Sequence, residues 1–144
     1  MQVTPLQVVR AFAALANGGA LPTPTIVRGA ASESEKIAIP DEYMQVAREG
    51  MRLAVTSENG TARAINVGGM ELAGKTGTAQ LGYHNEFMNS WVVGFWPYEN
   101  PRYAFAVVLE HAPAGTLSGA APGMSSFFRW LADTKPEYAN GTAE

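Results

Sequence analysis

The spacing of apolar residues predicts three helices. The first begins at Thr4–Gln7, where a capping threonine, a proline at the first helical position and a glutamine form a capping box. It ends at Asn17–Gly19, because glycine adopts the left-handed conformation at a helix C-terminus with little strain. A second helix is expected from Asp41 to Ser57, and a third from near Ser118. Their buried faces are predicted to carry Val8, Phe12, Leu15, Met44, Ala47, Met51, Val55, Met124, Phe127, Phe128 and Leu131.

Between and after these helices the pattern is weaker. Residues 20–40 form a surface connection with three prolines, in which Thr25–Val27 is expected to pair as a short strand. Gly50 costs the second helix about 1 kcal/mol relative to alanine, which predicts close packing there. The residues after Asp133 are polar and are expected to fray. We therefore predict one domain portion at residues 1–133, followed by a disordered tail at residues 134–144.

After residue 65 the period changes to that of strands. Three apolar, β-prone runs are Met70–Leu81, Ser90–Trp96 and Tyr103–Glu110. The turns between them are too short for a parallel crossover, so the strands should be antiparallel neighbours. The second and third runs are apolar at nearly every position, which predicts that both faces of the sheet are covered. The order helix, helix, three-stranded meander, helix predicts an α+β fold with helices packed on one antiparallel sheet.

The composition of the chain excludes several classes of function. The net charge of −3 over 144 residues leaves no basic face for nucleic acid. No apolar run approaches the length needed to span a bilayer, and the first residues lack the features of a signal peptide. Without cysteine, disulfides, thiolate catalysis and Cys-ligated zinc are excluded. His84 and His111 are isolated, so we predict no metal site and no cofactor.

The chemistry is concentrated in Gly74–Thr78. A lysine lies there among apolar neighbours, which predicts that its charge points into a cleft. Gly69–Thr76 also satisfies the P-loop pattern for nucleotide binding, but that site needs a pliable loop and a helix opening at the lysine. As a strand, the segment directs Lys75 and Gly77 to one face, and two threonine side chains to the other. At a sheet edge it could pair with an extended peptide, or simply protect the edge with one charged residue.

Lys-Thr-Gly is one of three motifs of β-lactamases and penicillin-binding proteins, alongside S-x-x-K and S-D-N. The chain resembles the transpeptidase domain of class B penicillin-binding proteins, particularly the penicillin-binding protein 2 type, from Val3 to about Asp133. The resemblance implies the C-terminal portion of the penicillin-binding protein/serine β-lactamase fold. The matching segments are Val3–Gln7, Ala13–Gly19, Gly60–Ala62, Ala73–Gln80 and Trp91–Pro97.

What the resemblance implies is a substrate-binding strand. Lys75 would orient and polarise the groups of the S-x-N motif. Thr76 and Thr78 would bind the terminal carboxylate of a D-alanyl-D-alanine stem peptide or a β-lactam, with Gly77 leaving space. The backbone N–H of Thr78 would form half of the oxyanion hole. The parent protein would lie at the bacterial inner membrane, facing the periplasm or the cell exterior.

The nucleophile motif of this family is absent from the sequence. None of the three lysines has a serine three residues before it, because Lys36, Lys75 and Lys135 follow Glu33, Leu72 and Ala132 at that spacing. Ser57-Glu58-Asn59 spells S-x-N but lies at a predicted helix end. We therefore expect the C-terminal part of a D,D-transpeptidase, missing its upstream part and inactive alone.

Two other functions stay open: a non-catalytic binding or assembly module of the same fold, and a P-loop nucleotide binder. By analogy with the family's five-stranded sheet, Tyr103–Glu110 would lack its outer neighbour. That edge predicts self-association.

Overall fold

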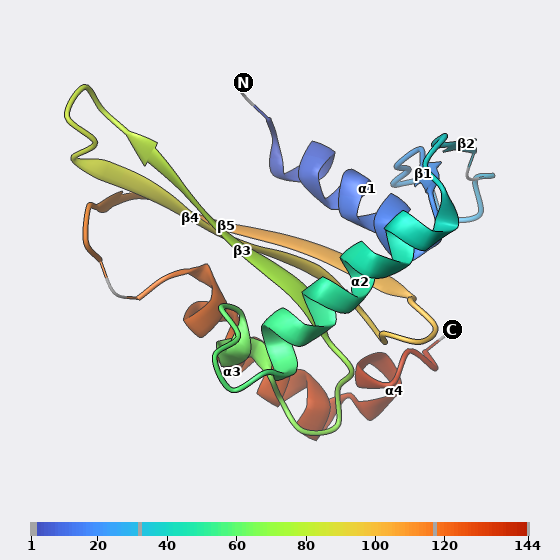
Figure 1. The fold of residues 1–144 in the computed structure, drawn as a ribbon. Helices are drawn as coiled ribbons and strands as arrows, with labels where there is room; N and C mark the ends of the chain where they lie inside the picture. The colour runs from blue at the N-terminus through green and yellow to red at the C-terminus, as the bar shows by residue number, and fades with distance from the viewer. Residues whose placement is uncertain (1–2, 32, 117, 144) are drawn as a thin grey trace.

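The computed structural model describes residues 3–31, 33–116 and 118–143. It is an α+β arrangement, as predicted (Figure 1). The elements in chain order are α1 (Pro5–Ala16), β1 (Ala20–Pro22), β2 (Ser34–Lys36), α2 (Asp41–Thr56), a 3-10 turn (Arg63–Ile65), β3 (Ala73–Leu81), β4 (Phe87–Trp96), β5 (Tyr103–Pro113), α3 (Ala120–Thr134) and α4 (Pro136–Ala139).

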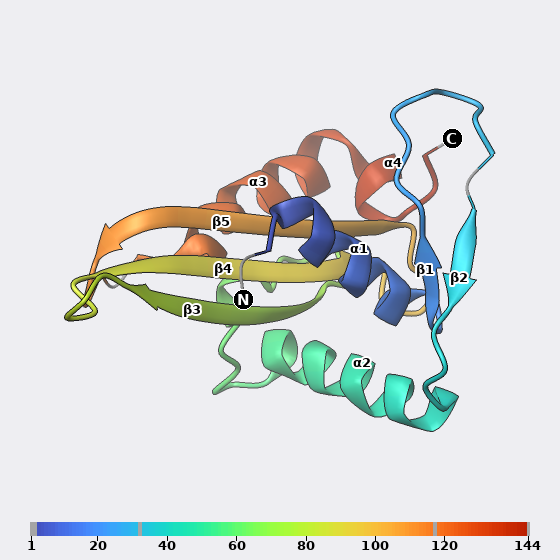
Figure 2. The ribbon, with the colours of Figure 1, turned by 90° about the horizontal axis from the view of Figure 1, so that it is seen from above.

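The central sheet has the order β3-β4-β5, and both of its strand pairs are antiparallel. Its ladders place Ala73 opposite Phe95 and Trp96 opposite Tyr103, with one irregularity between Met88 and Ser90. Figures 1 and 2 show α1 on one face of this sheet, α3 and α4 on the other, and α2 along β3. The predicted meander is therefore confirmed, and helices cover both of its faces.

The larger core lies between the sheet and α3. Phe128 is fully buried and its ring centroid lies 5.6 Å from that of Trp96 and 5.1 Å from that of Phe105. On the α1 face a smaller cluster joins Ala16, Met51, Ala73 and Phe95. Phe95 and Trp96 are therefore core residues on two opposite faces of β4, as strand alternation requires, while Trp91 is only half-buried.

The predicted helix boundaries are confirmed for α1 and α2. Thr4 and Gln7 form the capping box, with the Thr4 N–H donating to Gln7 Oε1 over 2.8 Å. Gly18 and Gly19 follow α1 with φ values of +74° and +93°, which glycine adopts without a side-chain clash. Ser57 is the C-cap of α2.

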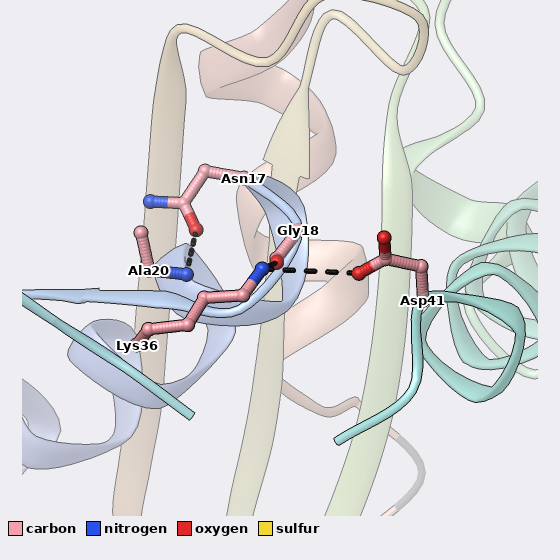
Figure 3. A network of polar contacts seen from close by, with 5 residues as sticks. All are labelled: Asn17, Gly18, Ala20, Lys36 and Asp41. Carbon is pink, nitrogen blue, oxygen red and sulfur yellow. Dashed lines mark hydrogen bonds and ion pairs between the residues drawn. The ribbon is translucent and has the colours of Figure 1, made fainter. Parts of the chain in front are cut away.

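A polar network ties the end of α1 to β2 and α2 (Figure 3). Asn17 Oδ1 accepts a hydrogen bond from the Ala20 N–H at 3.0 Å. Lys36 Nζ donates to the Gly18 carbonyl and lies 3.8 Å from Asp41 Oδ1. The ion pair is exposed, so its contribution to stability is small, and the backbone contacts define the turn.

Three expectations for the first half of the chain were wrong. Ala47 is exposed and does not belong to the buried face of α2. Thr25–Val27 is not a strand, because β1 and β2 pair on either side of it. All three β2 side chains are exposed, so this pairing rests on backbone hydrogen bonds and leaves no apolar pattern to read. Gly50 has no atom within 4 Å of an added Cβ, so nothing in the described residues packs closely there.

The third helix agrees with its prediction in position, with Pro122 in the first turn of α3. Phe127, however, is 43% exposed and lies beside Trp130 rather than in the core. Neighbouring Phe128 takes the buried position, because only one of two successive helical residues can point fully inward.

Within residues 134–143 the segment after Asp133 is folded in this structure, whereas the sequence predicts a disordered tail at residues 134–144. It forms α4, whose Ala139 is only 2% exposed. The indole N–H of Trp96 donates to the Tyr138 carbonyl at 3.0 Å. A buried tryptophan needs a hydrogen-bond partner for its N–H. The bond from Trp96 therefore holds α4 against the sheet, although the sequence of this segment is polar.

Candidate substrate-binding strand

β3 carries the Gly74–Thr78 segment along one edge of the sheet. In its register with β4, Lys75 lies opposite Val93 and Gly77 opposite Trp91. Directly opposite residues share a face, so Lys75 and Gly77 belong to the face that α1 covers. Thr76 and Thr78 belong to the α3 face, as the strand interpretation predicted.

The backbone N–H and C=O groups of β3 point alternately toward β4 and toward the free edge of the sheet. A methyl group added at Gly94 would lie 2.1 Å from the Ala73 carbonyl oxygen, so that carbonyl points across to β4. The Thr76 carbonyl instead accepts a hydrogen bond from Lys75 Nζ at 2.5 Å. Because the N–H and C=O of alternate residues share a direction, the N–H of Thr78 points to the same free edge as Thr76.

A groove of about 270 Å³ lies between α1 and this strand. Its walls are mostly apolar, and Lys75 supplies its charge. Lys75 is solvent-exposed rather than sheltered, because only the start of β3 is buried while the rest of the strand faces solvent. The groove is lined by Val3, Val8, Phe12, Lys75, Thr76, Gly77, Trp91 and Val93.

Two arginines of α2 hold backbone carbonyls beside this sheet, Arg52 at the entry to β3 and Arg48 after β4, and neither contact was predicted from the sequence. Arg52 Nη1 donates to the Leu72 carbonyl at 2.6 Å. Arg48 Nη2 donates to the Tyr98 carbonyl at 2.7 Å, and its guanidinium lies over the Phe95 ring. In the sequence these residues appear as two arginines one turn apart on the helix before the motif strand. Such a pair is ordinarily interpreted as exposed to solvent.

The other candidate residues do not join this site. Ser57 caps α2, as the sequence predicted, so its S-x-N spelling has a structural cause. His111 stacks on Phe87 with 4.4 Å between ring centroids, and His84 packs edge-on against Tyr83. Within residues 3–31, 33–116 and 118–143, no group of three histidine, aspartate or glutamate side chains is placed to hold a metal ion.

The structure contradicts the P-loop interpretation. Lys75 lies inside the nine-residue strand β3, not at the opening of a helix. A phosphate-binding loop requires backbone N–H groups converging at a helix N-terminus, and Gly69–Thr76 leads into a strand. Across the described part of the chain, no helix is long and apolar enough to cross a bilayer.

Comparison with known families gives a match over residues 1–129 to the penicillin binding protein transpeptidase domain. Among curated relatives, the peptidoglycan D,D-transpeptidase MrdA of Haemophilus influenzae is 34% identical over 144 aligned residues, covering 83% of this chain and 22% of that protein. Stage V sporulation protein D of Bacillus subtilis is 31% identical over 157 residues, covering 95% of this chain and 23% of that protein.

Solved structures agree on the fold. Penicillin-binding protein 2B of Streptococcus pneumoniae superposes with a TM-score of 0.75 at 24% identity, over 92% of this chain and 25% of that one. The transpeptidase domain of Burkholderia pseudomallei penicillin-binding protein 3 gives 0.70 at 24% identity, over 93% of this chain and 44% of that one.

These matches place the chain in the class of penicillin-binding proteins that carry a transpeptidase domain. The chain belongs to the penicillin-binding protein transpeptidase family, which confirms the predicted kinship. It spans 22% and 23% of the length of the two curated relatives named above.

Proposed function

We propose that β3 is one wall of a peptidoglycan D,D-transpeptidase active site. The observation that carries this proposal is a Lys-Thr-Gly-Thr segment on a strand whose outer edge is free of other strands in the described sheet. An extended peptide can add to such an edge through backbone hydrogen bonds. The substrate class is a stem peptide ending in D-alanyl-D-alanine, or a β-lactam in its place.

Each residue of the segment has a distinct role in this proposal. Lys75 supplies positive potential beside the bound carboxylate, and Thr76 and Thr78 donate hydroxyl hydrogen bonds to it. Gly77 leaves the backbone open to close approach. The N–H of Thr78 stabilises the negative oxygen that develops when the substrate carbonyl is attacked.

The nucleophile of this reaction lies outside these 144 residues. The sequence holds no S-x-x-K motif, and serine needs an adjacent base to become an effective nucleophile. This chain alone therefore binds the substrate and does not acylate. In the whole protein, the site would face the periplasm or the cell exterior at the inner membrane, where peptidoglycan is built.

Binding is tested by two-dimensional NMR of the isotope-labelled chain titrated with N-acetyl-D-alanyl-D-alanine. The amide signals of Thr76, Gly77 and Thr78 should shift, and the L,L-dipeptide should leave them in place. Lys75→Met should weaken binding about tenfold or more, since hydrogen bonds to charged groups contribute roughly 1.5–3 kcal/mol. The exposed Lys135→Met is the matched control. Unmoved β3 signals at saturating dipeptide would contradict the proposal.

Catalysis is tested separately with a fluorescent penicillin. We expect no label to remain on the chain after denaturation, because no activated serine is present. A label that survives denaturation would overturn the assignment of the nucleophile to another part of the protein. A non-catalytic module of the same fold would also remain unlabelled, but its β3 signals would not respond to the dipeptide.

A further inference from the structure

Ser90 of β4 lies directly opposite Thr78 of the motif strand. Directly opposite residues share a face, so the Ser90 side chain is on the α3 face with that of Thr78. The Ala73 carbonyl points across to β4, so odd-numbered residues carry the ladder hydrogen bonds. Thr78 and Ser90 therefore form a pair without ladder hydrogen bonds, in which the Cα atoms are only about 4.5 Å apart. A shift of Ser90 would be felt at Thr78.

Ser90 ties this position of the sheet to the start of α3. Its Oγ accepts a hydrogen bond from the Ala120 N–H at 3.0 Å. Ala120 is the first residue of α3, and the N-cap residue is Gly119, which has no side chain with which to cap the helix. The first N–H groups of a helix have no partner within it. Ser90 therefore satisfies one of them from the neighbouring strand.

Gly119 shows how closely the helix approaches β4. A Cβ added at this position would lie 2.5 Å from Ser90 Oγ, which is closer than two such atoms pack. The φ of Gly119 is −109°, a value that other residues adopt readily. Glycine is therefore needed here for space, and a larger residue would push the start of α3 away from Ser90.

The ladder between β4 and β5 is irregular beside Ser90. Its register shifts between Met88 and Ser90, and His111 has a φ of +60°. The His111 N–H donates instead to Asn89 Oδ1 at 2.9 Å. A bulge of this kind interrupts the ladder and bends the strand. The bond to Ala120 thus holds β4 where its pairing with β5 is weakest.

We propose that Ser90 is a positioning residue for Thr78. Through its bond to α3 it fixes the part of β4 opposite Thr78, and with it the direction in which the Thr78 N–H and hydroxyl meet the substrate. Ser90 lies one strand in from the substrate edge and does not touch the substrate. Its loss would misplace the donors of Thr78 without removing them. This inference rests on the proposed function of β3.

Two variants break the contact from opposite sides. Ser90→Ala removes the acceptor, and Gly119→Ala pushes the helix away from an intact serine. Each should raise the Kd for N-acetyl-D-alanyl-D-alanine roughly three- to tenfold in the NMR titration, an effect limited by the net contribution of one hydrogen bond. The double variant should bind no more weakly than the weaker single variant, because both changes act on one contact.

Leu131→Val is the matched control. Leu131 is a buried residue of α3, and shortening it destabilises the packing of the helix without touching Ser90. Urea denaturation should show a loss of stability, while the Kd of the folded variant should equal that of the parent chain. A role of Ser90 in stability alone predicts instead that Ser90→Ala, once folded by circular dichroism, binds as the parent does.

Hydrogen exchange reports on the same contact without a ligand. The Gly77 N–H points to β4 near Ser90, and the Phe95 N–H belongs to the buried end of the same ladder. Ser90→Ala and Gly119→Ala should speed exchange at Gly77 several-fold relative to Phe95, because only the exposed end loosens. Leu131→Val should leave this ratio unchanged.

The outcomes separate this inference from the proposed function. If the parent chain binds the dipeptide and both contact variants bind it equally well, the role of Ser90 is refuted and the function of β3 stands. A double variant whose effect is the sum of the two single effects would also refute it, because the changes would then act independently. If the parent chain does not bind the dipeptide, the proposed function fails, and the role assigned to Ser90 fails with it.

Discussion

The two ends of the β3–β4 ladder differ in what surrounds them. At the first end, Ala73 and Phe95 are completely buried, and Arg52 of α2 holds the Leu72 carbonyl. From the middle of β3 onward the strand is covered much less, and Gly77 and Thr78 are exposed. The motif therefore extends from a fixed core, so its backbone groups keep their direction without being covered. Positioning of this kind is what a binding strand needs.

Three glycines of this ladder allow the packing along it to be compared, because an added methyl group meets a different neighbour at each. At Gly94 the nearest atom is a backbone oxygen, at Gly74 it is the end of a side chain, and at Gly77 the contact is ordinary. The same substitution to alanine therefore measures how tightly each end is packed.

The largest effect is expected for Gly94→Ala. Its methyl group would lie 2.1 Å from the Ala73 carbonyl oxygen, and that carbonyl cannot move without opening the ladder. We expect a loss of at least about 3 kcal/mol in the free energy of unfolding, measured by urea denaturation. Gly123→Ala is the control, since nothing lies within 4 Å of that position and alanine favours the helix. Equal stability of the two variants would contradict the tight packing of this end.

Gly74→Ala should have an intermediate effect. The added methyl group would lie 2.9 Å from Ile65 Cδ1 and 3.3 Å from the Val93 carbonyl oxygen. The isoleucine side chain can shift, so we expect a loss of about 1–2 kcal/mol by the same measurement. Ile65→Val combined with Gly74→Ala should recover part of this loss by making room. No recovery would mean that the carbonyl, and not the side chain, sets the limit.

The smallest effect on stability is expected for Gly77→Ala. The methyl group would make an ordinary contact, 3.7 Å from Trp91 Cβ, so stability should change by no more than about 0.5 kcal/mol. Binding of N-acetyl-D-alanyl-D-alanine should weaken, because the methyl group narrows the groove beside Lys75. A variant that unfolds as readily as Gly74→Ala would place Gly77 in the packed end instead.

Much of the fold could be predicted from the sequence because its signals are local. Capping at Thr4, the glycines after α1 and the change of period after residue 65 each report on a few neighbouring residues. The orientation of Lys75 and Gly77 relative to Thr76 and Thr78 also follows from strand alternation alone. The motif itself depends on consecutive residues and was therefore readable.

The misses share a different cause. The pairing of β1 with β2 and the docking of α4 under Trp96 depend on partners far away in the chain. Arg48 and Arg52 act through carbonyl groups of Ala16, Tyr98 and Leu72, which are backbone groups that no side-chain pattern reveals. The exposure of Lys75 was also missed, because burial of its neighbours ends within the strand.

The boundaries of the first two helices, the order of the meander and the family motif follow from the sequence alone, since each is a short-range property of residue type and spacing. The tertiary structure was needed to find which end of β3 is buried. Arg52 and the residues around Gly74 bury the first end of β3, while the packing of the helices leaves the rest of the strand exposed. Burial is a property of the whole assembly of elements, so it cannot be read from any one of them.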